Sequence, residues 1–511
     1  MFADLSEATT VGAPTKDLIH LVTQFYMPSD PARHEEIKEA LRRNAANPHL
    51  ASITLLNERI YTEEELGTSD PKIKQRVIGH RALFSEMLVD RVGGYTVVAN
   101  ADIYLDESIA NVRRSDLHKA RKMYSLLRYE ADGRLFGPRA DSADTWIVHS
   151  NNALSLHELG LFRFEMGQPG CDNKICYLFY LLGFKVYNDP LFIKTHHLHA
   201  SEARAYGASV PPPYMFVAPA GVACPQFGQS PEVIKEVLVT YGWDGNERLG
   251  EYLRTRTKPF VIPRIAGIEN HAAMLGYYGN DLSEQARQVL KNNTGLHFDS
   301  KESVRAYASH YLAAFEKSEV YASWEPWGKY VKHIRESQQF IQKKFVRPQF
   351  GAFVLDIFNY VASEPWTRAL AGKRILLVSP FVDQFIGKAY PVDLFPGCTF
   401  VHVKPPMTQG GEPSRGWQAE FKELCEAVAK VEFDVALCSC GGYGNPLCAY
   451  IYSMGRSAIY VGGVLQMYFG VYGQRWLREQ KDATNLYMTA EWKRPTVRPK
   501  GHETIENGCY W

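Results

Sequence analysis

The beginning of the chain alternates between short apolar runs and longer stretches in which apolar and charged residues are mixed. The apolar runs at 18–25, 51–56 and 97–99 are predicted to be buried strands. The mixed stretches at 34–44 and 72–90 are predicted to be amphipathic helices. Strands joined by helices in this order are typical of a parallel sheet with helical crossovers. The first part of the chain is therefore predicted to have an α/β fold of the nucleotide-binding kind.

The third of these strands ends on side chains that carry oxygen. The segment 97–106 reads VVANADIYLD, in which Asn100 and Asp102 are two residues apart and would point to the same face of a strand. Open α/β sheets bind ligands at the carboxyl ends of their strands. A charge at this position needs a partner, because an unpaired ionised group beside a core is costly. Two interpretations stay open: Asp102 caps the turn that follows, or it binds a hard divalent cation such as Mg2+ or Mn2+.

A second group of polar candidates lies farther along the chain. Asp144 leads a short apolar strand, and Asp172 stands at the predicted start of a helix. Asp172 is either the N-terminal cap of that helix or an acid of the site. His197 and His199 follow and would share one face of an extended segment. They are open to three interpretations, namely metal ligands, phosphate contacts or a solvated strand end.

Composition limits the class of protein. The chain has 511 residues, of which 45% are hydrophobic and 22% charged, as expected of a globular chain with more than one domain. The net charge of +1 does not indicate nucleic acid as a partner. The nine cysteines are odd in number and include no CxxC pair, which is typical of a reduced, cytoplasmic protein. Neither a signal-peptide pattern nor a long apolar run occurs, so no membrane span is expected.

The composition changes after residue 202, where the chain becomes rich in Pro and Gly. This segment contains the run PPP and is predicted to be an extended connector. Short buried strands between 374 and 461 then indicate a second α/β sheet, with a helical insertion ahead of it. We therefore expect an N-terminal domain at 1–202, a linker at 203–231 and a C-terminal α/β domain at 232–511.

A glycine-rich turn, CGGYGNP at 440–446, joins a strand to a helix in the C-terminal domain. Backbone N–H groups of such a turn at a helix start form a phosphate cradle by geometry. The other interpretation is that the glycines only let the helices approach the sheet. A Rossmann NAD site is disfavoured, because the glycines do not follow the order G-x-G-x-x-G and no acid ends the next strand.

Five motifs follow one another in the N-terminal domain: Asn57-Glu58 after the second strand, ANADIYLD, DTWIV, PGCDN and HHLHAS. In this order they resemble the GT-A class of nucleotide-sugar glycosyltransferases, over residues 17–202. The resemblance implies that Asp102 is a metal ligand, together with His197 or His199. It implies that Mn2+ or Mg2+ is the cofactor and that Asp172 is the acid that faces the acceptor. It also implies donor-binding roles for Asn57, Glu58, Asn100, Asp102 and Asp144.

Two features qualify this assignment. Asn100 stands where the GT-A class has the first acid of its DxD motif, which leaves one fewer charge for the metal. Arg81 precedes the motif strand and is either a contact to the donor diphosphate or a solvated helix residue.

The C-terminal domain is recognised by the run FDVALCSCGGYGNPLCAYIYSMGRSAIYVGGVLQ. It is similar to the GT-D type of glycosyltransferase, whose donor site uses a short acidic motif after an early strand. By position, Gly267-Ile268-Glu269 is the nearest match, with the second acid present and the first absent. The similarity implies a catalytic role for Glu269. It implies donor-binding roles for Arg264, Gly441, Gly442, Tyr443, Gly444 and Gln466.

These patterns predict a glycosyltransferase that moves a sugar from a nucleotide-diphosphate sugar donor to a glycan or other saccharide acceptor. The metal would act at Asp102, and the C-terminal domain would be a second transferase domain. One alternative is a non-catalytic carbohydrate-binding or assembly protein that retains the folds, which the Asn100 substitution favours. Another is a nucleotide-dependent oxidoreductase that uses the glycine-rich turn, which the missing ribose acid opposes.

Overall fold

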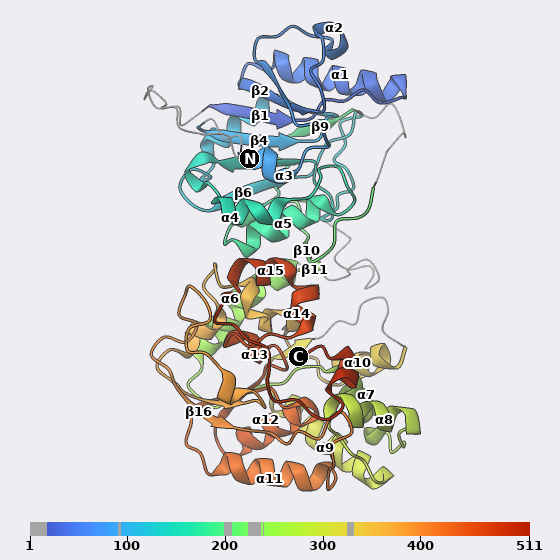
Figure 1. The fold of residues 1–511 in the computed structure, drawn as a ribbon, viewed down its shortest axis with the longest axis vertical. Coiled ribbons are helices and arrows are strands. Elements are labelled where there is room, and N and C mark those ends of the chain that lie inside the picture. The colour runs from blue at the N-terminus through green and yellow to red at the C-terminus, as the bar shows by residue number, and fades with distance from the viewer. Residues whose placement is uncertain (1–17, 90–92, 199–206, 223–236, 239, 324–331) are drawn as a thin grey trace. The chain divides into compact units, whose positions relative to one another are not determined.

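The chain folds into two compact units. The computed structural model describes residues 18–89, 93–198, 207–222, 237–238, 240–323 and 332–511. Unit 1 comprises residues 1–180 and 184–229, and unit 2 comprises residues 181–183 and 230–511. The change from unit 1 to unit 2 between residues 229 and 230 falls inside the Pro- and Gly-rich segment of the sequence. Figure 1 shows both units as α/β folds.

Unit 1 is built on a seven-stranded sheet with the order β3-β2-β1-β4-β7-β6-β8. The first four strands in this order run parallel, and β7 pairs antiparallel with both β4 and β6. The predicted α/β fold with a largely parallel sheet is thereby confirmed (Figure 1). The strands are β1 (Ile19–Thr23), β2 (Leu50–Asn57), β3 (Ile73–Val77), β4 (Tyr95–Ala99), β6 (Lys122–Leu126), β7 (Thr145–His149) and β8 (Lys185–Tyr187).

Helix α1 (Pro31–Ala46) connects β1 to β2 and starts at a well-defined cap. The Asp30 side chain accepts a hydrogen bond from the Ala32 N–H, and Pro31 stands at the first helical position, where its missing N–H is not needed. Near the other end, the Asn44 side chain donates to the Ile103 carbonyl at 2.8 Å. The remaining helices of unit 1 are α2 (Glu63–Leu66), α3 (Phe84–Val89), α4 (Leu156–Leu159), α5 (Cys171–Leu181) and the 3-10 helix η1 (Glu107–Arg114).

The prediction of one helix over 72–90 is wrong. Residues Ile73–Val77 form the edge strand β3, which pairs with β2, and only Phe84–Val89 are helical. Lys74 and Val77 are exposed on this edge, so the charged positions that suggested an amphipathic helix are the solvated positions of an edge strand. Pairing with β2 overrides the local helical pattern.

A small two-stranded sheet in unit 1 brings distant segments together. Strands β5 (Ile103–Leu105) and β9 (Thr195–His197) run antiparallel, with Ile103 opposite His197. This pairing places the histidine segment directly beside the residues that follow β4. A further short strand of unit 1 is β10 (Tyr214–Met215).

Unit 2 has a five-stranded parallel sheet in the order β12-β18-β17-β15-β16. Its helical insertion, from α7 to α10, lies between β12 and β15 in the sequence, as predicted. The strands of unit 2 are β11 (Val237–Leu238), β12 (Val261–Ile262), β13 (Tyr321–Ser323), β14 (Gln349–Gly351), β15 (Arg374–Val378), β16 (Thr399–Val403), β17 (Val435–Cys438) and β18 (Ser457–Tyr460). Its helices are α6 (Thr240–Thr255), α7 (Gly267–Tyr277), α8 (Glu284–Thr294), α9 (Lys301–Lys317), α10 (Lys332–Lys344), α11 (Trp417–Ala429), α12 (Gly444–Ser453), α13 (Leu465–Tyr468), α14 (Gln474–Glu479) and α15 (Lys481–Tyr487).

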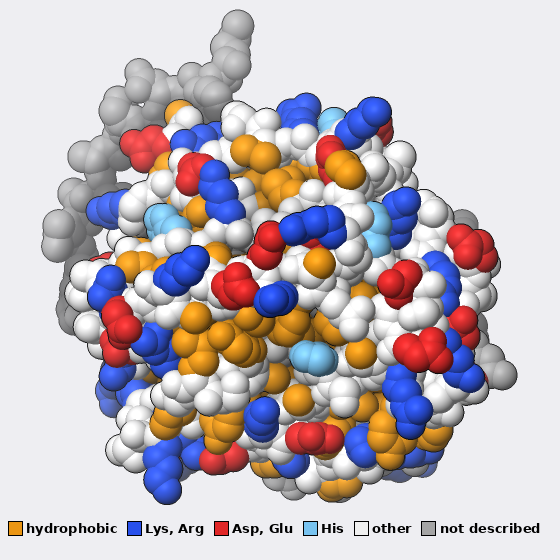
Figure 2. Space-filling view, turned by 90° about the horizontal axis from the view of Figure 1, so that it is seen from below, with side chains coloured by type: hydrophobic (Ala, Val, Ile, Leu, Met, Phe, Trp, Pro, Cys, Tyr) orange, Lys and Arg blue, Asp and Glu red, His pale blue; other side chains and the backbone are white. Residues whose placement is uncertain are grey.

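The charges on the surface are mixed and the described cysteines are unpaired, in keeping with the net charge of +1 and the absence of a CxxC pair. On the face drawn in Figure 2, Lys and Arg side chains are interspersed with Asp and Glu, and neither sign forms one large patch. The eight cysteines within the described ranges are free thiols. Among the helices described, none is long and apolar enough to cross a membrane.

Candidate functional site

Asp102 of unit 1 is buried and already paired. It follows β4, its relative exposure is 5%, and its Oδ2 accepts from Arg33 Nη1 at 2.7 Å and from His197 Nε2 at 3.0 Å. Burial alone would raise the pKa of Asp102. The hydrogen bond from His197 and the charge of Arg33 outweigh it and hold this pKa well below its usual range. Asp102 is therefore ionised at neutral pH.

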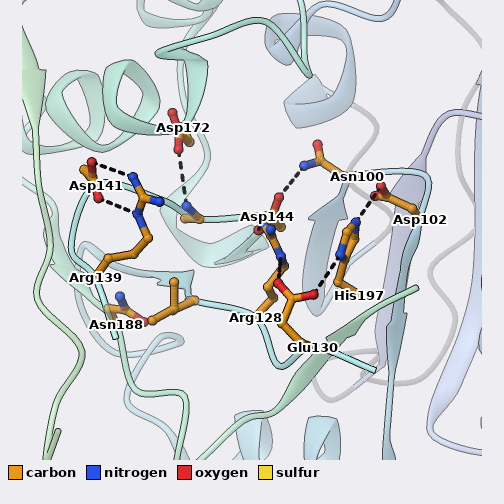
Figure 3. Close-up of polar contacts among 12 residues, drawn as sticks. Asn100, Asp102, Arg128, Glu130, Arg139, Asp141, Asp144, Asp172, Asn188 and His197 are labelled. Carbon is orange, nitrogen blue, oxygen red and sulfur yellow. Dashed lines mark hydrogen bonds and ion pairs between the residues drawn. The ribbon is translucent and has the colours of Figure 1, made fainter. Parts of the chain in front are cut away.

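The polar contacts continue from Asp102 along one connected chain of side chains (Figure 3). His197 Nδ1 lies 3.3 Å from Glu130, whose other carboxylate oxygen accepts from Arg128 Nε at 3.0 Å. Arg128 Nη1 also donates to Asp144 at 2.7 Å, and the Asn100 amide donates to the other Asp144 oxygen at 2.8 Å. We call Arg33, Asn100, Asp102, Arg128, Glu130, Asp144 and His197 the unit 1 network.

The backbone explains why these residues meet. Asp144 precedes β7, which pairs antiparallel with β4, so Asn100 and Asp144 lie at the same edge of the sheet. Their backbones also join there, because the Asn100 N–H donates to the Asp144 carbonyl at 3.1 Å. His197 arrives by the pairing of β9 with β5. The edge is the carboxyl end of the parallel strands, where α/β sheets bind ligands.

Asp172 lies in the first turn of α5, near this network but not part of it. Its carboxylate accepts from the N–H groups of Asn173 at 3.0 Å and of Ala143 at 3.3 Å. Burial and the nearby charge of Asp144 raise the pKa of Asp172 to about 7. A carboxyl group with such a pKa can take up a proton at neutral pH, as a general base must.

The pair Asp102 and His197 can be tested as ligands of a divalent cation. The carboxylate of Asp102 suits Mn2+ or Mg2+, whereas the imidazole of His197, 3.0 Å away, is a ligand more typical of softer transition metals. The other nitrogen of His197 lies against Glu130, as is usual for a metal-ligating histidine. Mg2+ is commonly bound by one or two protein side chains and completed by substrate phosphates. Asp102 is one carboxylate of that kind, and Arg33 contacts the same carboxylate oxygen.

Two further observations bear on metal binding. Within the described ranges, no group of three or more His, Cys, Asp or Glu side chains is arranged to hold a metal. His199, the other predicted ligand, lies outside the described residues.

Three predicted donor-binding residues of unit 1 lie apart from the network. Asn57 is fully buried, accepts from the Phe25 N–H at 3.0 Å and donates to Gln75 at 3.0 Å, and so ties the ends of β1, β2 and β3 together. Glu58 is exposed and accepts from the Tyr61 hydroxyl. Arg81 lies in the loop before α3, not on the expected helix, and its Nε is 4.0 Å from a Glu165 oxygen. Their role in donor binding stays a prediction.

Unit 2 contains a cavity of about 920 Å3 at the carboxyl end of its parallel sheet. Its wall includes residues that follow β12, β15, β17 and β18. Four of the predicted site residues line this cavity, namely Arg264, Glu269, Gly441 and Gln466. Glu269 lies in the first turn of α7, and its burial, with the nearby charge of Glu506, raises its pKa to about 7.

The other residues of the glycine-rich turn are packed by neighbouring side chains. A Cβ placed on Gly442 would collide with the Leu296 side chain, and one on Gly444 with the Tyr460 ring. Tyr443 is fully buried, and its hydroxyl donates to the Gly295 carbonyl at 3.1 Å. The lining of the cavity does not include Gly442, Tyr443 or Gly444. This geometry agrees with the interpretation that these glycines permit close packing.

Several residues of both sites escaped the sequence analysis. Arg33 had a detectable signal, because it lies with Glu36 and Ile37 on one buried face of α1, where unpaired charges are not expected. Arg128 follows a buried strand and could have been noted in the same way as Asp102. Asp356 and Arg475 on the cavity wall of unit 2 had no motif around them.

Comparison with known proteins gives weak likenesses. No family model and no curated protein matches the chain. One solved structure with a likeness is the mannosyltransferase PcManGT from Pyrobaculum calidifontis in complex with GDP-Man and Mn2+, at 12% identity and a TM-score of 0.27. That match covers 40% of this chain and 63% of the mannosyltransferase chain.

A second solved structure is S. aureus TarS 1-349, at 11% identity and a TM-score of 0.24, covering 36% of this chain and 59% of that one. This chain thus spans less than two thirds of either structure. At such scores, neither likeness assigns an activity to this protein.

Proposed function

We propose that unit 1 is a glycosyltransferase that transfers a sugar from a nucleotide-diphosphate sugar to a glycan or other saccharide acceptor. The observation that carries this proposal is that two carboxyl groups with opposite pKa shifts lie near the same sheet edge. Asp102 is held ionised by cationic partners, whereas Asp172 has a pKa of about 7. The first suits charge stabilisation and the second suits proton transfer.

The proposed reaction joins the acceptor oxygen to the anomeric carbon while the bond from that carbon to the diphosphate breaks. The acceptor hydroxyl gives its proton to the Asp172 carboxylate, and the departing nucleoside diphosphate keeps the electron pair. The N–H groups of Asn173 and Ala143 hold the Asp172 carboxylate in a fixed orientation. Mn2+ or Mg2+ held by Asp102 and His197 would supply positive charge next to the diphosphate.

The unit 1 network has a positioning role in this proposal. Glu130 and Asp102 hold the His197 ring from both sides, and Arg128 links Glu130 to Asp144. Side chains fixed in this way need no reorganisation when a charged donor binds.

A non-catalytic carbohydrate-binding protein is the second candidate. One observation favours it, since Arg33 occupies the carboxylate that would face the metal. The oxidoreductase alternative has less support, because Leu296 and Tyr460 pack directly against Gly442 and Gly444 of the glycine-rich turn.

The test is release of nucleoside diphosphate from a panel of nucleotide sugars by the purified chain, with Mn2+ and with EDTA. We expect turnover with at least one donor and a loss of about 100- to 10,000-fold in Asp172→Asn, as for removal of a general base. Asp132→Asn is the matched control, because Asp132 is an exposed carboxylate that forms an ion pair with the surface residue Arg134. Absence of turnover with every donor would favour the non-catalytic alternative.

We further propose that unit 2 is a second transferase domain, with Glu269 as its acid. The support is the position of Glu269 on a large cavity at the carboxyl end of a parallel sheet. The two-site proposal predicts that Asp172→Asn and Glu269→Gln abolish different products. Equal loss of one single product in both variants would contradict two independent sites.

A further inference from the structure

The cavity of unit 2 contains a positioned guanidinium group that forms no ion pair with any residue the structure describes. The Arg264 backbone is fixed by Asn445, whose side chain accepts from the Arg264 N–H at 3.1 Å and donates to its carbonyl at 2.8 Å. The guanidinium lies against the turn after β18, where a Cβ on Gly462 would collide with Nη1. A glycine at 462 therefore makes room for the Arg264 side chain.

The surroundings do not neutralise this charge. Within the described residues, Arg264 forms no ion pair, and its buried Nε has no hydrogen-bond partner. The nearby carboxyl groups of Glu269 and Asp356 both have a pKa that burial raises to about 7. Neither is fully ionised at neutral pH. Arg264 is half-buried on the cavity wall, and a guanidinium with a buried, unpartnered Nε gains by binding an anion.

The rest of the wall offers groups that suit a sugar. Gln466 is 1% exposed, and its Oε1 has no hydrogen-bond partner within the described ranges, so a ligand hydroxyl could donate to it. Trp476, Tyr510 and Trp511 add aromatic rings to the same cavity. Aromatic faces combined with a few polar groups are typical of small-molecule sites.

A second cation, Arg475 of α14, lies on the same wall. It is paired with Glu506, and a Glu479 oxygen is 3.9 Å from its Nε. Arg475 is thus already compensated, and Arg264 is the group that lacks an anion. The volume of about 920 Å3 is at the upper end of the range for small-ligand pockets and accommodates more than a single phosphate.

We propose that this cavity binds a phosphate-bearing saccharide, with Arg264 on the phosphate and Gln466 and Asp356 on hydroxyl groups of the sugar. The inference deepens the proposed role of unit 2 and rests on it for the saccharide part of the ligand. Arg264 is suited to the phosphate, because a guanidinium binds it through two parallel hydrogen bonds. A nucleotide sugar and a sugar phosphate share this chemistry.

The test is isothermal titration calorimetry on the full chain. The probes are UDP, GDP, UDP-glucose, GDP-mannose and glucose 1-phosphate. Arg264→Met is expected to weaken one binding site by about 10- to 100-fold, the value of a charged hydrogen bond. Arg368→Met is the matched control, because Arg368 is an exposed arginine of unit 2 that does not line the cavity. Asp356→Asn keeps the shape of the side chain and is expected to weaken the same site less.

The outcomes separate this inference from the proposed function of unit 1. Two sites in the native chain and one in Arg264→Met support both. A single site that is lost in Arg264→Met supports the inference and contradicts donor binding by unit 1. A single site that Arg264→Met retains overturns the inference, and so does the absence of binding by every probe.

Two further comparisons complete the test. Equal affinity for glucose 1-phosphate and the nucleotide sugars identifies a sugar-phosphate site, whereas a requirement for the nucleoside identifies a nucleotide-sugar site. Arg264→Lys retains the positive charge but cannot form bidentate hydrogen bonds. If this variant binds more weakly and its melting temperature is unchanged, a folding defect is excluded. Full affinity in a folded Arg264→Met protein would overturn the proposal.

Discussion

The two units differ in the pKa shifts of their buried carboxyl groups. In unit 1, Asp102 is enclosed by Arg33 and His197, and its pKa is held well below the usual range. In unit 2, Glu269 and Asp356 lie on a cavity without hydrogen bonds from other side chains among the described residues, and both have a pKa of about 7. The contrast teaches that a buried carboxylate stabilises the fold when it is paired. A buried carboxyl group without a charged partner remains available to a ligand or a proton.

Asp172 belongs with the second kind, although it lies in unit 1. Its hydrogen bonds come from two backbone N–H groups and the Asn173 side-chain amide, none of which carries a charge, and its pKa is about 7. Unit 1 thus combines an ion-paired carboxylate with one that has only uncharged hydrogen-bond donors at the same sheet edge. Three predictions test this distinction and a fourth tests the glycine-rich turn of unit 2, in order from the largest expected effect to the smallest.

Removing the paired carboxylate should be strongly destabilising. Asp102→Ala removes the carboxylate that Arg33 and His197 share and leaves them with Glu36 and Glu130, and breaking a buried ion pair costs about 3–5 kcal/mol. Urea denaturation of the full chain measures the loss. Asp132→Ala, which removes an exposed carboxylate of the same unit, should change the free energy of unfolding by less than about 0.5 kcal/mol. Equal stability of the two variants would show that the unit 1 network does not hold the fold.

Removing the unpaired carboxyls of unit 2 should instead stabilise the protein at high pH. Between their ordinary pKa values and about 7, the folded chain binds more protons at Glu269 and Asp356 than the unfolded chain does. These two groups therefore lower the free energy of unfolding as the pH rises through this range. The double variant Glu269→Gln, Asp356→Asn should match the native chain near pH 4 and exceed it in free energy of unfolding by several kcal/mol at pH 8.

Urea denaturation at a series of pH values checks this prediction. Parallel curves for the native chain and the double variant would contradict the raised pKa values. The single variants should each show part of the effect.

Filling the packed turn of unit 2 should be costly in stability. Gly442→Ala forces a methyl group into the Leu296 side chain, and overpacking of this kind costs about 1–3 kcal/mol. Gly387→Ala is the control, because a Cβ there meets no atom within 4 Å and the backbone needs no positive φ. If Gly442→Ala instead kept its melting temperature and lost nucleotide binding, the turn would be a phosphate cradle.

The pH dependence of sugar transfer should follow Asp172. A general base acts as the carboxylate, so kcat/KM should rise as the pH increases through about 7 and be about tenfold higher at pH 8 than at pH 6. Initial-rate measurements between pH 5 and 9 with a saturating acceptor check this. A rate that is flat over this range would remove Asp172 from the proton transfer.

Part of the unit 1 site followed from local sequence. Asn100, Asp102 and Asp144 were marked by their positions at the ends of apolar strands, and the structure joins Asn100 to Asp144 directly. The prediction of a helix over 72–90 was wrong for a related reason. An edge strand with one solvated face mixes apolar and charged residues, as an amphipathic helix does. Arg33 and Asp356 were missed, because their importance depends on neighbours that are distant in the sequence.

The sequence by itself determined the alternation of strands and helices, the acidic residues at strand ends and the glycines of the turn, because these are properties of residues near one another in the chain. Only the tertiary structure decided which charges are paired. Arg33 reaches Asp102 from helix α1, and Arg264 forms no ion pair within the described residues, where the nearby Glu269 and Asp356 have raised pKa values. Charge pairing and the pKa values that follow from it depend on distances and burial, which exist only after the chain has folded.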